Sequence, residues 1–188
     1  MSEILRAVPS CVVREAAREG PPLLTGRFAV FNRWTEIDSF IEGHFMERVA
    51  PGAFLPTFVR DRARMKVLFE HGLDPQIGRK VLGPIETLRE DALGAYYEVP
   101  LFDTAYNAEL LPGLRAGSYG ASFRGEPVRF DVDHFPKRSE YNPERLPEHT
   151  LREVELIDFG PVTFPAYEGA TAGVRSLTDW YVSKKKAA

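Results

Sequence analysis

The sequence predicts a mainly β domain of the α+β class: a small, closed or nearly closed antiparallel β-barrel with helices packed outside. Three observations support this prediction. Short apolar segments rich in β-branched and aromatic residues recur along the chain, the connections between them are short, and only two segments have helical character. With 188 residues, of which 44% are hydrophobic and 27% charged, the chain is long enough for one domain with a sizeable core.

The ends of the chain differ in composition from its middle. Residues 1–22 mix charged residues with alanine and end at Gly20-Pro21-Pro22, so we expect a flexible N-terminal segment followed by a stiff break. The domain proper is predicted over residues 23–177. Residues 178–188 form a C-terminal tail, whose three lysines we interpret as solvated.

The first elements of the domain are two strands and a helix. Residues 24–31 alternate between apolar and polar positions and contain aromatic and β-branched residues, which predicts a strand. Residues 44–49 are a second strand, closed by Pro51-Gly52. A helix over residues 53–63 follows, because Pro56 falls in its first turn, where a missing N–H does little harm.

The middle of the chain is predicted to be mostly strand. The segments concerned are 65–71, 77–82, 85–89 and 95–101, and the turn residues of 90–94 predict that the last two form a hairpin.

A second helix should run from Thr104 towards Leu111, with Asp103 as its cap. Pro112-Gly113 disturbs it, and the segment should finish by Gly117.

Two further strands complete the domain. One continues from Ser122 towards Val132, and the other covers residues 151–158. Between them, residues 133–149 contain three prolines and are predicted to form a long loop, either a mobile surface connection or a lid over the site. A Pro-Ala-Tyr turn at residues 165–167 ends the domain.

Charge, cysteine content and hydropathy argue against several classes of partner and location. A net charge of −3 gives no case for nucleic acid as a partner. One cysteine, Cys11, rules out an internal disulfide. No apolar run approaches membrane-spanning length, and the first residues lack the apolar core of a signal peptide, so we expect a cytosolic protein without a membrane partner.

Three residues at the ends of predicted strands could form a nucleophilic site. Ser122 follows a run of small residues that would let an extended peptide approach and would leave backbone N–H groups uncovered. His71 shares the parity of the apolar residues in its strand. Asp158 shares a face with Val154 and Leu156 and should be partly buried.

Other interpretations of these residues stay open. His71 could be a satisfied core histidine, and Ser122 could be a packing residue. Glu153 and Glu155 point to the opposite face and are weaker candidates for the acid that orients His71. Arg124 shares the face of Ser122, so it could orient substrate or stabilise negative charge, or it could be an exposed salt-bridging arginine.

Two familiar arrangements are not supported by the sequence. The run Gly120-Ala-Ser-Phe-Arg124 lacks the final glycine of a nucleophile elbow and continues as a strand. The four histidines show no i, i+4 pairing on a helix and have no accompanying cysteines, so no metal site is expected.

Five blocks of sequence in order resemble the prohead (capsid maturation) serine proteases of tailed bacteriophages, whose fold is similar to that of herpesvirus assemblin. The blocks are residues 25–31, 48–54, 67–71 followed by Ile77-Gly78, 120–124, and 158–167 with 169–176. The resemblance covers roughly residues 24–177.

The resemblance implies specific roles. His71 matches the general base and Ser122 the nucleophile, while Asp158 lies where many members carry a glutamate. Backbone N–H groups beside Ser122, at Ala121 and Phe123, and the Arg124 side chain are candidates for holding the oxyanion or the substrate.

The resemblance also implies partners. The substrates would be the scaffold, or the N-terminal scaffolding segment of the major capsid protein, inside assembling proheads in the host cytoplasm. Self-cleavage would finish the process, no cofactor is implied, and self-association is plausible because assemblins work as dimers. The alternatives are a non-catalytic scaffold or capsid-assembly protein on the same fold, and an unrelated β-barrel binding module.

Overall fold

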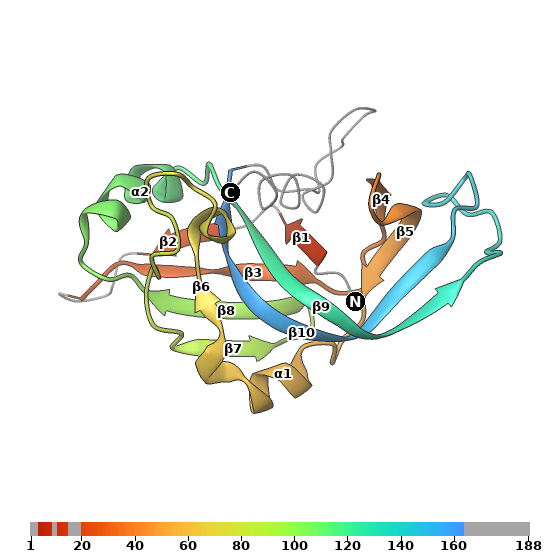
Figure 1. The fold of residues 1–188 in the computed structure, drawn as a ribbon, viewed down its shortest axis with the longest axis horizontal. Helices are drawn as coiled ribbons and strands as arrows, with labels where there is room; N and C mark the ends of the chain where they lie inside the picture. Colours follow the sequence, from red (N-terminus) through yellow and green to blue (C-terminus); the bar gives the residue numbers. More distant parts are fainter. Residues whose placement is uncertain (1–3, 9–10, 15–19, 164–188) are drawn as a thin grey trace.

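A computed structural model describes residues 4–8, 11–14 and 20–163, and Figure 1 shows the arrangement of its elements. The strands are β1 (Ile4–Val8), β2 (Cys11–Arg14), β3 (Leu23–Val30), β4 (Thr35–Ser39), β5 (Gly43–Val49), β6 (Lys66–Val67), β7 (Thr87–Glu90), β8 (Gly94–Pro100), β9 (Gly120–Asp133) and β10 (Glu148–Val162). The helices are α1 (Leu55–Arg60) and α2 (Ala105–Arg115), with 3₁₀ turns η1 (Arg62–Arg64) and η2 (Phe69–Gly72).

The described strands form two sheets. One has the order β1-β9-β10-β5-β4, with β6 also paired to β10, and the other has the order β2-β3-β8-β7. The α+β class is therefore confirmed. The closed or nearly closed antiparallel barrel is not, because the described strand pairing leaves both sheets open. The first sheet is also mixed, since β10 pairs in parallel with β5 and with β6.

The long hairpin of β9 and β10 carries the site (Figure 1). Its two strands are antiparallel, and Phe123 is opposite Phe159 in the register. Both rings are fully buried in a cluster of aromatic side chains, in which Phe28 lies 4.8 Å from Phe159 and Phe54 lies 5.2 Å from Phe123, measured between ring centroids. Since side chains alternate along a strand, the residues next to these two rings project from the opposite face of the hairpin.

The N-terminal segment contains two paired strands, where the sequence predicted a flexible segment. β1 pairs antiparallel with β9, and β2 pairs antiparallel with β3. The edges of β9 and β3 offer unpaired backbone groups, and these partners satisfy them. Ile4 and Arg6 of β1 are both almost completely buried.

Several predicted elements have different bounds. The strand expected over 65–71 is two residues long and gives way to η2, and 77–82 contributes only an isolated bridge between Leu68 and Val81. β4 was not predicted. The second helix continues through Pro112 to Arg115, because the Ala116 N–H closes the next turn on the Pro112 carbonyl at 3.0 Å.

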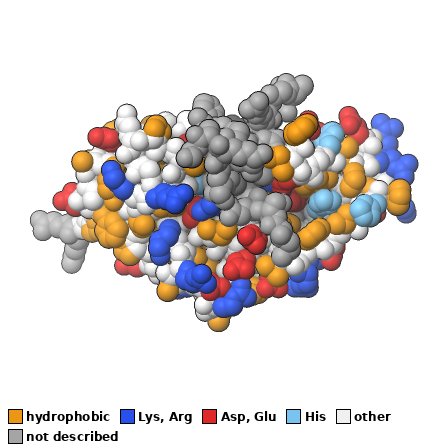
Figure 2. Space-filling model, in the orientation of Figure 1, with side chains coloured by type: hydrophobic (Ala, Val, Ile, Leu, Met, Phe, Trp, Pro, Cys, Tyr) orange, Lys and Arg blue, Asp and Glu red, His pale blue; other side chains and the backbone are white. Residues whose placement is uncertain are grey.

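The expected loop over 133–149 is confirmed up to the start of β10 at Glu148. The Pro-Ala-Tyr turn and the C-terminal tail lie outside the described residues. Within the described ranges, no helix combines the length and apolar character needed to cross a bilayer. Acidic and basic side chains occur together on the face shown in Figure 2.

Candidate active site

The structure brings together the three side chains that the sequence singled out. Ser122 lies on β9, Asp158 lies on the neighbouring β10, and His71 comes from η2. The Nε2 atom of His71 is 2.8 Å from Oγ of Ser122, and its Nδ1 atom is 2.6 Å from Oδ1 of Asp158. All three residues are buried. An alcohol, an imidazole and a carboxylate hydrogen-bonded in this order can carry out nucleophilic acyl transfer.

His71 reaches this position through an unusual backbone conformation. Glu70 and His71 have φ angles of 49° and 53°, and Gly72 has 76°, so three residues in succession are left-handed. Such a conformation costs of order 1 kcal/mol or more for each non-glycine residue. Contacts around the turn help to hold it, because the Thr163 N–H donates to Oε1 of Glu70 at 2.6 Å.

Gly160 allows the segment before η2 to approach β10 closely. It lies opposite Ser122 in the β9–β10 register, and a Cβ atom built at this position would be 2.0 Å from the Leu68 carbonyl oxygen. The Leu68 N–H donates to the Phe159 carbonyl at 3.0 Å, so the two chains are hydrogen-bonded at this point. A side chain at residue 160 would push the His71 segment away from Ser122.

Asp158 is held as a carboxylate by hydrogen bonds to His71 and to the guanidinium of Arg124. Burial acts to raise its pKa, but the hydrogen bond and charge of His71 and the guanidinium of Arg124 outweigh burial and hold the pKa below its ordinary value. Nε and Nη2 of Arg124 both donate to Oδ2 of Asp158, at 2.8 and 2.5 Å. Arg124 is opposite Asp158 in the hairpin register, a pairing that the sequence alone did not reveal.

The remaining predicted residues lie in two different environments. Ala121 and Phe123 are in the part of β9 that pairs with β1 on one edge and with β10 on the other. Glu155 is exposed and Glu153 is half-buried. Of the three candidate acids, Asp158 is therefore the one that hydrogen-bonds to His71.

The strand β1 covers the serine, which sequence analysis missed. Ala7 is opposite Ser122 in the β1–β9 register, and Oγ of Ser122 lies 2.8 Å from the carbonyl oxygen of Arg6, to which it can donate. A hydroxyl has one hydrogen, so Ser122 donates either to this carbonyl or to His71. The sequence gives little signal for this strand, because β1 has five residues, too few for periodicity to stand out.

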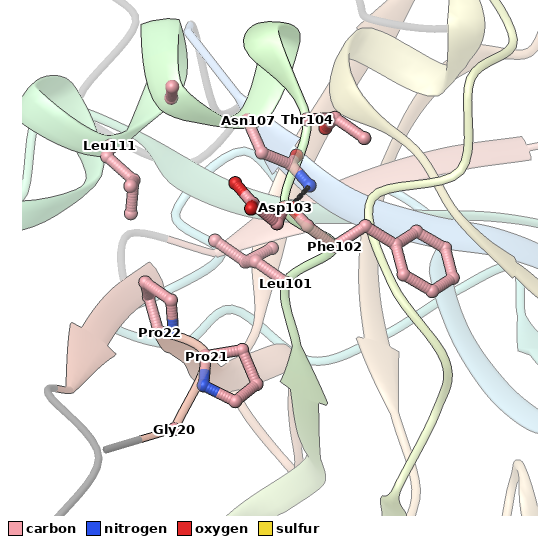
Figure 3. A pocket seen from close by; sticks show the side chains of 10 residues that line it. Gly20, Pro21, Pro22, Leu101, Phe102, Asp103, Thr104, Asn107 and Leu111 are labelled. Atoms are coloured by element: carbon pink, nitrogen blue, oxygen red, sulfur yellow. Dashed lines mark hydrogen bonds between the residues drawn. The ribbon is translucent and has the colours of Figure 1, made fainter.

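A separate pocket lies between residues 20–22 and the start of α2, away from these side chains (Figure 3). Its volume is about 550 Å³, and Ser122, His71 and Asp158 are not among the residues that line it. In the part of the chain that the structure describes, no group of three or more His, Cys, Asp or Glu side chains could hold a metal ion.

The geometry is that of a serine hydrolase site on a mainly β domain, and comparison with known proteins gives the family. Residues 10–181 match the family described as Caudovirus prohead serine protease. The chain belongs to this family of serine peptidases and is a capsid maturation protease.

One solved structure found to be similar is the bacteriophage T4 capsid assembly protease, gp21. It has 10% sequence identity and a TM-score of 0.49, and the alignment covers 87% of this chain and 98% of that one. A search of curated proteins gives no match.

Proposed function

We propose that this protease cleaves peptide bonds with Ser122 as nucleophile, His71 as general base and Asp158 as the acid that orients His71. The observation that carries the proposal is the continuous chain of hydrogen bonds from Oγ of Ser122 through both ring nitrogens of His71 to Asp158. Arg124 completes the chain by fixing the second oxygen of Asp158.

The reaction proceeds in two acyl-transfer steps. Oγ of Ser122 attacks the carbonyl carbon as His71 takes its proton, and His71 then gives that proton to the leaving amine. Water, activated by the same imidazole, hydrolyses the acyl-enzyme. Asp158 keeps the proton on Nδ1 and stabilises the imidazolium between these steps.

Backbone N–H groups of β9 beside Ser122, at Ala121 and Phe123, are the proposed oxyanion donors. One such donor contributes about 3–4 kcal/mol in enzymes from which it has been removed. Because β1 occupies one edge of β9 and β10 the other, a substrate can pair with this part of β9 only after β1 leaves its edge.

The family membership supports a substrate inside the prohead. We propose that the protease acts within assembling proheads in the host cytoplasm on the scaffold, or on an N-terminal scaffolding segment of the major capsid protein. It then cleaves its own chain.

Co-expression with the matching capsid and scaffold proteins tests this proposal. Ser122→Ala should abolish processing of both, as followed by intact mass. The control Ser118→Ala alters an exposed serine just before β9 and should leave processing intact. A fluorophosphonate probe should label the wild type after β1 is displaced and should not label Ser122→Ala. Unchanged processing in Ser122→Ala would reject the mechanism and favour a non-catalytic assembly role.

A further inference from the structure

The strand β1 occupies the edge of β9 in the way that an extended peptide would. It is antiparallel to β9, and its register places the Arg6–Ala7 peptide bond beside Ser122. The Arg6 carbonyl is 2.8 Å from Oγ of Ser122. Addition of an extended peptide to an open sheet edge is a common recognition mode, in which main-chain hydrogen bonds give affinity and side-chain subsites give specificity.

The side chain of Arg6 enters a subsite lined by two carboxylates. Its Nε donates to Oε1 of Glu47, and its Nη2 lies 3.1 Å from Oε2 of Glu47 and 3.0 Å from Oε1 of Glu42. The Arg6 side chain is 3% exposed, and those of Glu42 and Glu47 are 8% and 4% exposed. Buried charges in contact require opposite partners, so a neutral or acidic side chain in place of Arg6 would be strongly disfavoured.

The subsite is built from ordered elements that do not belong to β1. Glu47 lies on β5, which is paired with both β4 and β10. Glu42 lies in the turn between β4 and β5, where Oγ of Ser39 accepts the N–H of Ile41 at 3.2 Å and that of Glu42 at 2.9 Å. The two carboxylates are therefore placed by their own strands and turn, and they face each other across the position of one cation.

We propose that Glu42 and Glu47 form the specificity subsite for an arginine or lysine on the acyl side of the scissile bond, and that the protease's own Arg6 fills it here. The proposal rests on the proposed function, because it takes Ser122 as the nucleophile. It makes the β9 edge the substrate edge and the bond after the basic residue the one that is cleaved. A purely structural Arg6–Glu47 pair would anchor β1 and would create no sequence preference in substrates.

Peptide hydrolysis by the full chain carrying Arg6→Gln tests the subsite without its internal occupant. The substrates are a fluorogenic peptide with the sequence of residues 3–9 and matched peptides with Lys, Gln or Glu in place of the arginine. The Arg peptide should have a kcat/KM about 100-fold or more above that of the Gln peptide, with Lys intermediate and Glu lowest. Mass spectrometry should place the cut directly after the basic residue.

Carboxylate variants in the same Arg6→Gln background assign the preference. Glu47→Gln and Glu42→Gln should each reduce the Arg-to-Gln ratio, and together they should bring it close to one. Because residue 6 is a neutral glutamine in this background, these variants leave no buried cation without a partner. Circular dichroism checks that they fold. The control Glu36→Gln changes an exposed carboxylate of the adjacent β4 and should leave the ratio unchanged.

The outcomes separate this proposal from the proposed function. Equal Ser122-dependent cleavage of the Arg and Gln peptides overturns the subsite and leaves the serine mechanism standing. If no peptide is cleaved, the subsite is tested by binding alone. Fluorescence anisotropy then measures the affinity of the labelled Arg and Gln peptides for the double variant Arg6→Gln/Ser122→Ala. Tighter binding of the Arg peptide that is lost with Glu47→Gln supports the subsite, and equal binding of both peptides overturns it.

Discussion

Asp158 hydrogen-bonds to two side chains, one through each carboxylate oxygen. Oδ1 accepts from His71 and Oδ2 accepts from Arg124. With both oxygens engaged, the carboxylate cannot rotate without breaking a hydrogen bond, so its direction towards His71 is fixed.

Replacement of this carboxylate by an amide should reduce catalysis far more than stability. In Asp158→Asn the amide group can present an N–H to Nδ1, which leaves His71 with its proton on the nitrogen facing Ser122. We expect kcat to fall by about 10⁴-fold, as for the corresponding change in a serine protease triad. Peptide kinetics measure this, and Glu155→Gln, an exposed carboxylate on the same strand, is the control. A loss below tenfold would contradict the orienting role.

Burial of Asp158 was predicted correctly from the sequence, but the face on which it lies was not. Strict alternation placed it with Val154 and Leu156, whereas a register shift between Leu156 and Asp158 puts it opposite Arg124, on the other face of the hairpin. The same reasoning predicted burial of His71 but gave the wrong backbone, since the left-handed turn at Glu70 and His71 has no periodic signal. The ion pair of Arg124 depends on strand register, which local sequence does not specify.

At the scale of elements, the short turn η2 and the hairpin β9–β10 form the site by close backbone approach. Gly160 lies at the point of contact, and a Cβ atom there would meet the backbone of Leu68. The His71 turn and the Ser122 strand are therefore positioned by backbone packing as well as by hydrogen bonds.

Gly160→Ala should separate these two elements. Because the added methyl group overlaps the Leu68 carbonyl, we expect the free energy of unfolding to fall by about 1–3 kcal/mol. The rate at which the probe labels Ser122, measured after β1 is displaced, should fall with it. Urea unfolding and probe kinetics measure the two effects. Gly52→Ala is the control, since a Cβ at Gly52 has open space and only its φ of +88° is unfavourable. Normal labelling in Gly160→Ala would show that η2 is positioned by other contacts.

Short edge strands were the elements that sequence analysis missed. β1, β2 and β4 contain 5, 4 and 5 residues, too few for alternation to stand out from a polar segment. Each of them pairs with a longer strand: β1 with β9, β2 with β3 and β4 with β5. The partner of β1 is more than a hundred residues away in the sequence, so a local pattern does not reveal that pairing. Longer strands such as β8 and β9 were predicted because their alternation extends over more residues.

For the whole molecule, the acid stability should fall in two stages. Burial lowers the pKa of His149, so the unfolded chain takes up its proton first and stability is lost as pH falls below about 6.5. Below about pH 4 the unfolded chain also protonates Asp158 and Asp91 first. The pKa of Asp91 is lowered to about 2, mainly by its hydrogen bond with Arg27.

Urea unfolding between pH 7.5 and 3 measures both stages. We expect the free energy of unfolding to decline gently from pH 7 to 5 and more steeply below 4. His149→Phe should remove the first stage, because the new ring can stack on Phe45 as the imidazole does at 4.0 Å. Asp91→Asn should weaken the second stage. Stability that rises as pH falls from 7 to 5 would contradict the sign assigned to His149.

The α+β class of the fold could be predicted from the sequence, but whether its sheets close into a barrel could not. Strand periodicity and helix signals are local, whereas closing a barrel depends on which edges meet after folding. β10 illustrates the difficulty, since it pairs antiparallel with β9 and in parallel with β5 and β6 along different parts of its length. The covering of Ser122 by β1 is likewise a property of long-range pairing.

The order of β1 and β9 along the chain has a consequence for biosynthesis. A ribosome makes residues 4–8 more than a hundred residues before it makes Ser122, so the strand that covers Ser122 is made before the proposed nucleophile. Under the proposed mechanism, the newly made chain folds with Ser122 already covered, and cleavage begins only after β1 leaves the edge of β9.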